Sequence, residues 1–69
     1  MNIYLNGEAR EVSAGCTVAE LIEGMALGDR RVAVEINLEI VPRSEHAAHR
    51  LQPGDKVEIV QAIGGGQVR

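Results

Sequence analysis

The chain opens with apolar and polar residues in alternation, the period of two that marks a half-buried β-strand. Met1, Ile3 and Leu5 share one face of this segment. The Asn6-Gly7 dipeptide that follows predicts a tight hairpin turn, because both residues tolerate a positive φ. We therefore expect residues 8–12 to return as a second, antiparallel strand and residues 13–15 to form a loop.

A helix is predicted to follow this loop. Thr17 and Glu20 have the spacing of a capping box, in which each side chain binds the backbone amide of the other residue. Gly24 weakens the interior of the helix, and Gly28-Asp29 is expected to end it. The apolar residues recur at helical spacing and form one stripe, made of Val18, Leu21, Ile22 and Met25.

Alternation returns after the helix. Residues 32–36 predict a third strand, with Val32, Val34 and Ile36 on one face. A turn at Asn37-Leu38 and a short strand over residues 39–41, ended by Pro42, are expected next.

The rest of the chain is less regular until its last strand. Ser44 is expected to cap one helical turn over residues 45–48, and Leu51 to anchor this stretch to the core. Pro53-Gly54-Asp55 has the composition of a turn. Residues 56–63 predict the last strand, and because both of its faces are partly apolar, it is expected to be central.

The predicted order of elements is that of an α+β protein with a ubiquitin-like β-grasp fold. We expect a five-stranded mixed sheet with one main helix, a domain over residues 1–63, and a flexible glycine-rich C-terminal tail over residues 64–69. Agreement between periodicity, caps and turns supports this fold. The core is predicted to contain Met1, Ile3, Leu5, Val18, Leu21, Ile22, Met25, Val32, Val34, Ile36, Leu51, Val57 and Ile59.

The size and the net charge of the chain exclude several classes of function. A chain of 69 residues has one small core and no room for a deep catalytic pocket, so we do not expect an enzyme. A net charge of −3 argues against a nucleic-acid partner. The single cysteine excludes an internal disulfide. We find no signal-peptide pattern and no apolar run of the ~20 residues that span a bilayer, so we expect a cytoplasmic protein with no membrane partner.

The histidines and the cysteine do not predict a site. His46 and His49 are three residues apart, but zinc needs three or four protein ligands and Cys16 lies far away in another loop. We therefore expect no metal and two solvated imidazoles. Cys16 precedes the helix cap, where the pKa of a thiol can fall, but packing on Leu21 as a hydrophobic staple is the simpler role. The acidic residues show no catalytic pairing and are assigned to the surface.

The glycine run near the carboxyl end is more informative. Gly64, Gly65 and Gly66 follow directly on the last predicted strand. A phosphate-binding loop would need a helix after the glycines, and none is predicted. A tail without side chains can enter a narrow channel in another protein and present its carboxylate there. Composition alone favours a flexible terminus or a linker.

Five segments carry a further pattern. They are NGE at 6–8, GCTVAEL at 15–21, VAVEINLEIVPR at 32–43, LQPGDKVEIV at 51–60 and AIGGG at 62–66. Together they resemble the ThiS family of sulfur carriers in thiamine biosynthesis, over the whole chain to Gly66. The L-x-x-G-D-x-V pattern is shared with other β-grasp carriers, whereas I-V-P-R and the short chain point to the thiamine branch.

The resemblance implies a carrier that serves partner enzymes. An E1-like adenylyltransferase of the ThiF type would consume ATP to join the terminal carboxylate to AMP, and the carrier itself would bind no cofactor. A cysteine desulfurase or another persulfide donor would replace AMP with sulfur. The thiocarboxylate would then give its sulfur to a ThiG-type thiazole synthase. Gly66 would carry the adenylate and the thiocarboxylate, with Gly65 and Gly64 as the flexible tail.

Two positions depart from the family pattern. Asn37-Leu38 stands where Asn-Gly is expected. The family also ends at its glycine pair, whereas Gln67, Val68 and Arg69 follow here. While they are attached, Gly66 has a peptide bond in place of a carboxylate. Either a protease removes them, or they are a cloning remnant, or this copy is inactive.

Other functions stay open at this point. The same tail chemistry serves the small subunit of molybdopterin synthase, although that branch tends to be longer and more aromatic. A ubiquitin-like protein modifier and an inert β-grasp binding module are further alternatives. In any carrier, we expect the partner interface on the sheet face opposite the helix, where Tyr4, Val60 and Ala62 have the matching parity.

Overall fold

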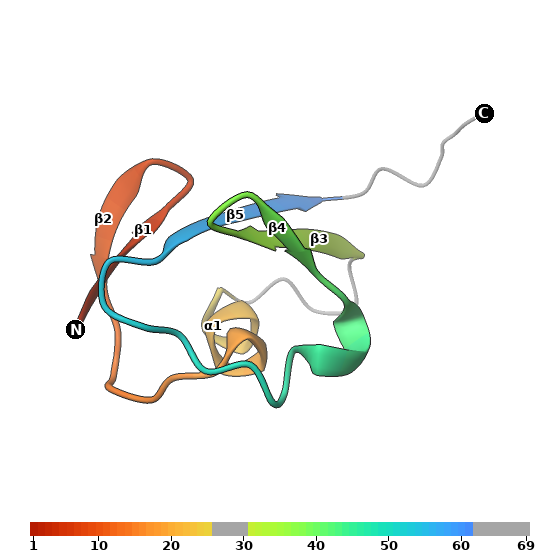
Figure 1. The fold of residues 1–69 in the computed structure, drawn as a ribbon, viewed down its shortest axis with the longest axis horizontal. Helices are drawn as coiled ribbons and strands as arrows, with labels where there is room; N and C mark the ends of the chain where they lie inside the picture. Colours follow the sequence, from red (N-terminus) through yellow and green to blue (C-terminus); the bar gives the residue numbers. More distant parts are fainter. Residues whose placement is uncertain (26–30, 62–69) are drawn as a thin grey trace.

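The computed structural model describes residues 1–25 and 31–61, and its elements follow the expected order (Figure 1). The predicted boundary between domain and tail at residues 63 and 64 lies outside the described residues. The elements are β1 (Asn2–Leu5), β2 (Glu8–Glu11), α1 (Val18–Gly24), β3 (Val32–Ile36), β4 (Glu39–Val41), a 3₁₀ helix (Arg43–Glu45) and β5 (Lys56–Gln61).

The five strands form one mixed sheet in the order β2-β1-β5-β3-β4. Strand β5 pairs in parallel with β1 and antiparallel with β3, and the two hairpins β1–β2 and β3–β4 extend the sheet on either side. The helix α1 covers one face (Figure 1). The β-grasp prediction and the central place of the last strand are therefore confirmed.

Both predicted hairpin turns are present. Asn6 and Gly7 have φ values of 50° and 87°, as the tight turn requires. Asn37 and Leu38 adopt the same left-handed region, with φ values of 53° and 73°. The leucine thus does not change the turn geometry, but its Cβ makes that conformation unfavourable.

The capping box at the start of α1 is confirmed. The Thr17 Oγ1 accepts from the Glu20 amide at 3.1 Å, and the Glu20 Oε1 accepts from the Thr17 amide at 2.9 Å. The helix ends at Gly24, with Met25 as its C-cap. The predicted stop at Gly28-Asp29 is therefore wrong, because the helix already ends at Gly24, a glycine that weakens the helical conformation.

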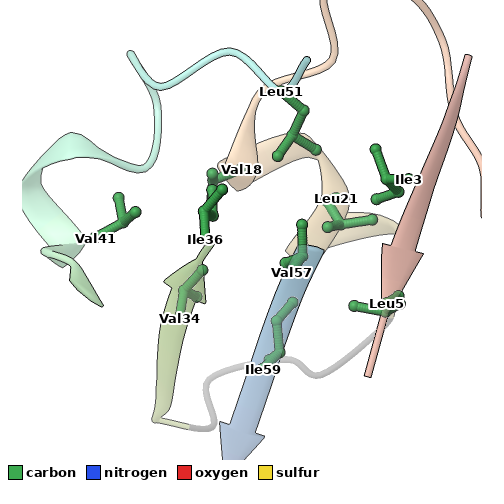
Figure 2. Close-up of a cluster of buried hydrophobic side chains, with 10 residues drawn as sticks. All are labelled: Ile3, Leu5, Val18, Leu21, Val34, Ile36, Val41, Leu51, Val57 and Ile59. Atoms are coloured by element: carbon green, nitrogen blue, oxygen red, sulfur yellow. The ribbon is translucent and has the colours of Figure 1, made fainter. Parts of the chain in front are cut away.

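The core lies between the sheet and α1 (Figure 2). Nine of the predicted core residues are buried, and Val41, which the sequence did not identify, joins them. Four others, Met1, Ile22, Met25 and Val32, are partly buried and pack against this core. The buried set is Ile3, Leu5, Val18, Leu21, Val34, Ile36, Val41, Leu51, Val57 and Ile59.

The segment between β4 and β5 contains one wrong prediction. The short helix begins at Arg43 with Pro42 as its N-cap, and no side chain caps it. Ser44 lies inside that helix and is not its cap, because Pro42 already fixes the extended conformation that precedes the first turn. Leu51 is the expected anchor, and its amide donates to the Cys16 carbonyl at 2.8 Å.

Leu21→Ala is expected to lower the free energy of unfolding by about 2–5 kcal/mol, because it leaves a cavity under the sheet. Urea denaturation measures the loss. Ile40→Ala is the matched control, since the Ile40 side chain is 74% exposed and its truncation should change stability by less than about 0.5 kcal/mol. Equal midpoints for the two variants would contradict the core assignment.

Leu38→Gly is expected to raise the free energy of unfolding by about 1 kcal/mol, because glycine adopts a positive φ without the Cβ contact. Thermal denaturation measures the gain. Leu38→Ala retains the Cβ and should leave the midpoint nearly unchanged. A glycine variant no more stable than the alanine variant would show that this turn is unstrained.

Candidate functional site

In the described residues, no helix or loop covers the sheet face opposite α1, which is called the outer face from here on (Figure 1). The strand registers place alternate residues of all five strands on it. All of them are exposed except Glu35, which is half-buried. They are Asn2, Tyr4, Ala9, Glu11, Ala33, Glu35, Ile40, Lys56, Glu58 and Val60.

Two of the three predicted interface residues lie on the outer face. Tyr4 is 46% exposed on β1 and Val60 is 61% exposed on β5. Val60 is paired with Ala33 of β3. The next pair, Val32 with Gln61, is the last one in the described part of β5. The third residue, Ala62, lies outside the described residues. Tyr4 lies beside Lys56 of β5, and Glu58 lies between Lys56 and Val60 on the same face, so the two apolar side chains are separated by charged residues.

The sequence did not identify two other exposed apolar residues. Leu38, at the tip of the β3–β4 hairpin, is 85% exposed, and Ile40 on β4 is 74% exposed. Ile40 is the cross-strand partner of Glu35 and therefore belongs to the outer face. The apolar positions of this face thus reach from β1 to the edge strand β4.

A hollow of about 260 Å³ indents the surface beside Tyr4. Its lining residues come from β1, the first hairpin turn and the start of β5: Tyr4, Gly7, Lys56, Val57 and Glu58. This volume is below the range of roughly 300–1,000 Å³ usual for small-molecule pockets.

The cysteine is not an activated nucleophile. Burial raises the pKa of the Cys16 thiol, and the neighbouring Glu20 carboxylate adds to the rise. The Sγ atom donates to the Thr17 carbonyl at 3.4 Å, and the side chain packs against the core. A raised pKa leaves less thiolate at neutral pH, in agreement with the structural role expected from the sequence.

The expectation of two solvated imidazoles is wrong for His46. Its side chain is 8% exposed, and its Nε2 lies 3.1 Å from the Val41 carbonyl oxygen. That hydrogen bond satisfies Nε2 and connects His46, the C-cap of the short helix, to β4. His49 is half-buried. Within residues 1–25 and 31–61, no group of three or more potential ligands is placed to hold a metal ion.

The described residues thus provide an exposed outer face, and the chemistry that the sequence predicts belongs to the tail. Gly64, Gly65 and Gly66 lie outside the described residues, as do Gln67, Val68 and Arg69. They follow β5, the strand that carries Val60. No helix in the described part of the chain is long and apolar enough to cross a bilayer.

Comparison with known proteins reveals full-length relatives. The sulfur carrier protein ThiS of Escherichia coli K12 is 41% identical over 66 residues, which are 96% of this chain and 100% of that protein. The crystal structure of the thiamine biosynthesis protein ThiS from Geobacter metallireducens superposes with a TM-score of 0.82 at 32% identity. The superposition covers 96% of this chain and 100% of the Geobacter chain.

Other relatives are much longer proteins. A thiazole synthase of Paramagnetospirillum magneticum is 50% identical over 66 residues, which are 96% of this chain but 20% of that protein. A thiazole synthase of Magnetococcus marinus is 43% identical over 97% of this chain and 21% of its own length. This chain therefore spans about one fifth of these two relatives.

The family comparison covers nearly the whole chain. The ThiS family pattern matches residues 3–66, from the start of β1 to the third glycine of the tail. The E. coli relative and the Geobacter structure agree with this match in both sequence and fold. On these grounds the chain belongs to the ThiS family.

Proposed function

We propose that this chain is the sulfur carrier for formation of the thiazole ring of thiamine. The observation that carries the proposal is the family match through Gly66, together with the E. coli sulfur carrier that the chain covers completely. A carrier needs a surface for its partners and an unhindered reactive end. The outer face offers the first, and the glycine tail is proposed to offer the second.

Gly66 is proposed as the residue that carries the sulfur, after removal of Gln67, Val68 and Arg69. The family match ends at Gly66, which supports this choice. A carboxylate is a poor electrophile, so its oxygen first attacks the α-phosphate of ATP and releases pyrophosphate. The terminal sulfur of a persulfide then displaces AMP and forms an acyl disulfide with its donor. A second thiol attacks the donor's sulfur, forms a disulfide with it and releases the thiocarboxylate. Gly65 and Gly64 let the chain end enter a narrow site, because they have no side chains.

In this proposal the carrier is a co-substrate and its partners are the catalysts. They are an adenylyltransferase of the ThiF type, a cysteine desulfurase or other persulfide donor, and a thiazole synthase of the ThiG type. The two relatives named thiazole synthase support the last partner. ATP is consumed by the adenylyltransferase and not held by the carrier. Because the chemistry requires ATP and reduced thiols, we expect it in the cytoplasm.

The partner interface is proposed to lie on the outer face at Tyr4 and Val60, continuing to Ala62. Val60 is exposed near the end of β5, only four residues before the first tail glycine. A partner that covers Val60 therefore also positions the start of the tail. The alternatives of a protein modifier and an inert module share this fold. ATP–pyrophosphate exchange distinguishes a carrier from an inert module, and a thiocarboxylate at Gly66, detected by intact-mass analysis, distinguishes a sulfur carrier from a protein modifier.

The chain that ends at Arg69 is expected to show no ATP–pyrophosphate exchange with the adenylyltransferase, whereas a chain truncated after Gly66 should show it. Only a free carboxylate can attack the α-phosphate. Intact-mass analysis before and after the reaction verifies each terminus. The proposed carrier chemistry would be refuted if both chains showed equal exchange while residues 67–69 were still attached to the longer one.

Val60→Asp is expected to weaken binding to the adenylyltransferase by about tenfold or more, because it places a charge in the apolar contact. Isothermal titration calorimetry measures the affinity, and circular dichroism verifies the fold. Glu23→Ala, on the exposed side of α1, serves as the control. Unchanged affinity in Val60→Asp would locate the interface elsewhere.

A further inference from the structure

Strand β4 is an edge strand of the sheet, so one side of its backbone pairs with no other strand in the described residues. The Asn37 amide donates to the Lys56 carbonyl at 2.8 Å, which points the Asn37 backbone groups toward β5. Backbone groups of successive residues point to alternate sides of a strand, so those of Glu35 also point to β5. Ile40 is the partner of Glu35. Its N–H and C=O groups therefore point away from β3, to the free edge.

The free edge of β4 offers the two backbone groups of this one residue. By the same alternation, Glu39 and Val41 turn their backbone groups to β3. Pro42 has no N–H, and its carbonyl accepts from the Glu45 amide at 2.9 Å. One donor and one acceptor on a single residue suit an antiparallel pair about a two-fold axis, because the N–H of each copy then donates to the C=O of the other.

The side chains at this edge are apolar and exposed. Ile40 is 74% exposed on β4, and Leu38 is 85% exposed at the tip of the hairpin. Pro42, directly after β4, is also exposed. A two-fold axis at Ile40 places Ile40 opposite Ile40 of the second copy, and Leu38 of each copy opposite Pro42 of the other. Association would remove these apolar surfaces from water.

The backbone conformation of Leu38 supports a use for this hairpin outside the single chain. Its φ of 73° is unfavourable for a residue with a Cβ. In the part of the chain that the structure describes, Leu38 is not among the apolar side chains that pack against the core. A residue that breaks a local rule without a compensating contact in its own domain points to a function.

The other edge strand, β2, is protected against such pairing. All four of its residues are exposed, and all except Ala9 are charged. Charged side chains on an edge strand are a common means of preventing contact with another chain. Strand β4 has one charged residue, Glu39, which is paired with the buried Ile36 and therefore lies on the opposite face from Ile40.

We propose that two copies of this chain pair through β4 about a two-fold axis at Ile40, which joins their sheets into one continuous sheet. A second copy is the occupant because it meets this edge with its complement: donor with acceptor, Ile40 with Ile40, and Leu38 with Pro42. The paired segment is short, so the dimer is weak, with a dissociation constant of about 0.1 mM. The axis is perpendicular to the sheet, so both outer faces stay exposed on one side. The inference is independent of the proposed function.

Sedimentation equilibrium of the full chain, from about 20 µM to about 1 mM, measures the dimer. The wild type should associate more tightly at high salt, because each copy has a net charge of −3. Ile40→Lys should weaken the dimer by about tenfold or more, since it places two positive charges opposite each other. Ala9→Lys, on the exposed strand β2, is the matched control and should associate as the wild type does.

A mixture of two variants tests the axis itself. Ile40→Lys and Ile40→Glu should each stay monomeric alone, whereas their equimolar mixture should associate at low salt, because the lysine of one variant faces the glutamate of the other. High salt should weaken this mixed dimer. Circular dichroism verifies the fold of each variant, since Ile40→Glu adds a carboxylate opposite Glu35.

Leu38→Gly separates a contact in the dimer from a role in folding. At about 10 µM, where the weak dimer is dissociated, the variant should be more stable than the wild type, because glycine tolerates the positive φ. Its dissociation constant should nevertheless rise about threefold to tenfold, because the apolar contact with Pro42 of the second copy is lost.

Three results would overturn the proposal: a wild-type chain that is monomeric at about 1 mM, an Ile40→Lys variant that associates normally, or a mixture of the two charged variants that stays monomeric. An unchanged dissociation constant in Leu38→Gly would overturn the contact assigned to Leu38. ATP–pyrophosphate exchange by the chain ending at Gly66 tests the proposed function separately.

Discussion

The central position of β5 is the constraint on which the rest of the structure depends. This strand joins the two hairpins into one sheet: it pairs in parallel with β1 of the first hairpin and antiparallel with β3 of the second. Its inward side chains, Val57 and Ile59, lie under α1 in the middle of the core (Figure 2). Its outward side chains, Lys56, Glu58 and Val60, form the middle of the outer face. One strand thus contributes to both the core and the outer face, and in the sequence it directly precedes the segment that contains the three glycines.

Two asparagines show how far local patterns reach. The sequence identified Asn6 and Asn37 as turn residues, and both have the positive φ expected. The structure gives each a second role, because the Asn6 Oδ1 accepts from the Ile59 amide and the Asn37 Oδ1 accepts from the Lys56 amide. These bonds join each hairpin to β5. The residues they join are up to 53 positions apart in the sequence, so these hydrogen bonds could not be predicted from a local sequence pattern.

The candidate site likewise combines features that local sequence patterns predict with features that depend on contacts between distant residues. The parity of Tyr4 and Val60 could be derived from alternation within single strands. Ile40 could not, because Ile40 and Val41 are adjacent apolar residues in a three-residue strand and only the register decides which one is buried. The pairing of Glu35 with Glu58 likewise depends on a register between strands that are distant along the chain.

The first and last strands of the domain are neighbours in the sheet, and this arrangement has a consequence for folding on the ribosome. Until residues 56–61 have left the exit tunnel, β1 and β3 have no strand between them and the core lacks its middle. Non-local pairings of this kind form late and slowly. By the time β5 emerges, the glycines that follow it have already been polymerised. The sheet, and with it the outer face, is therefore not complete before Gly64, Gly65 and Gly66 have been made.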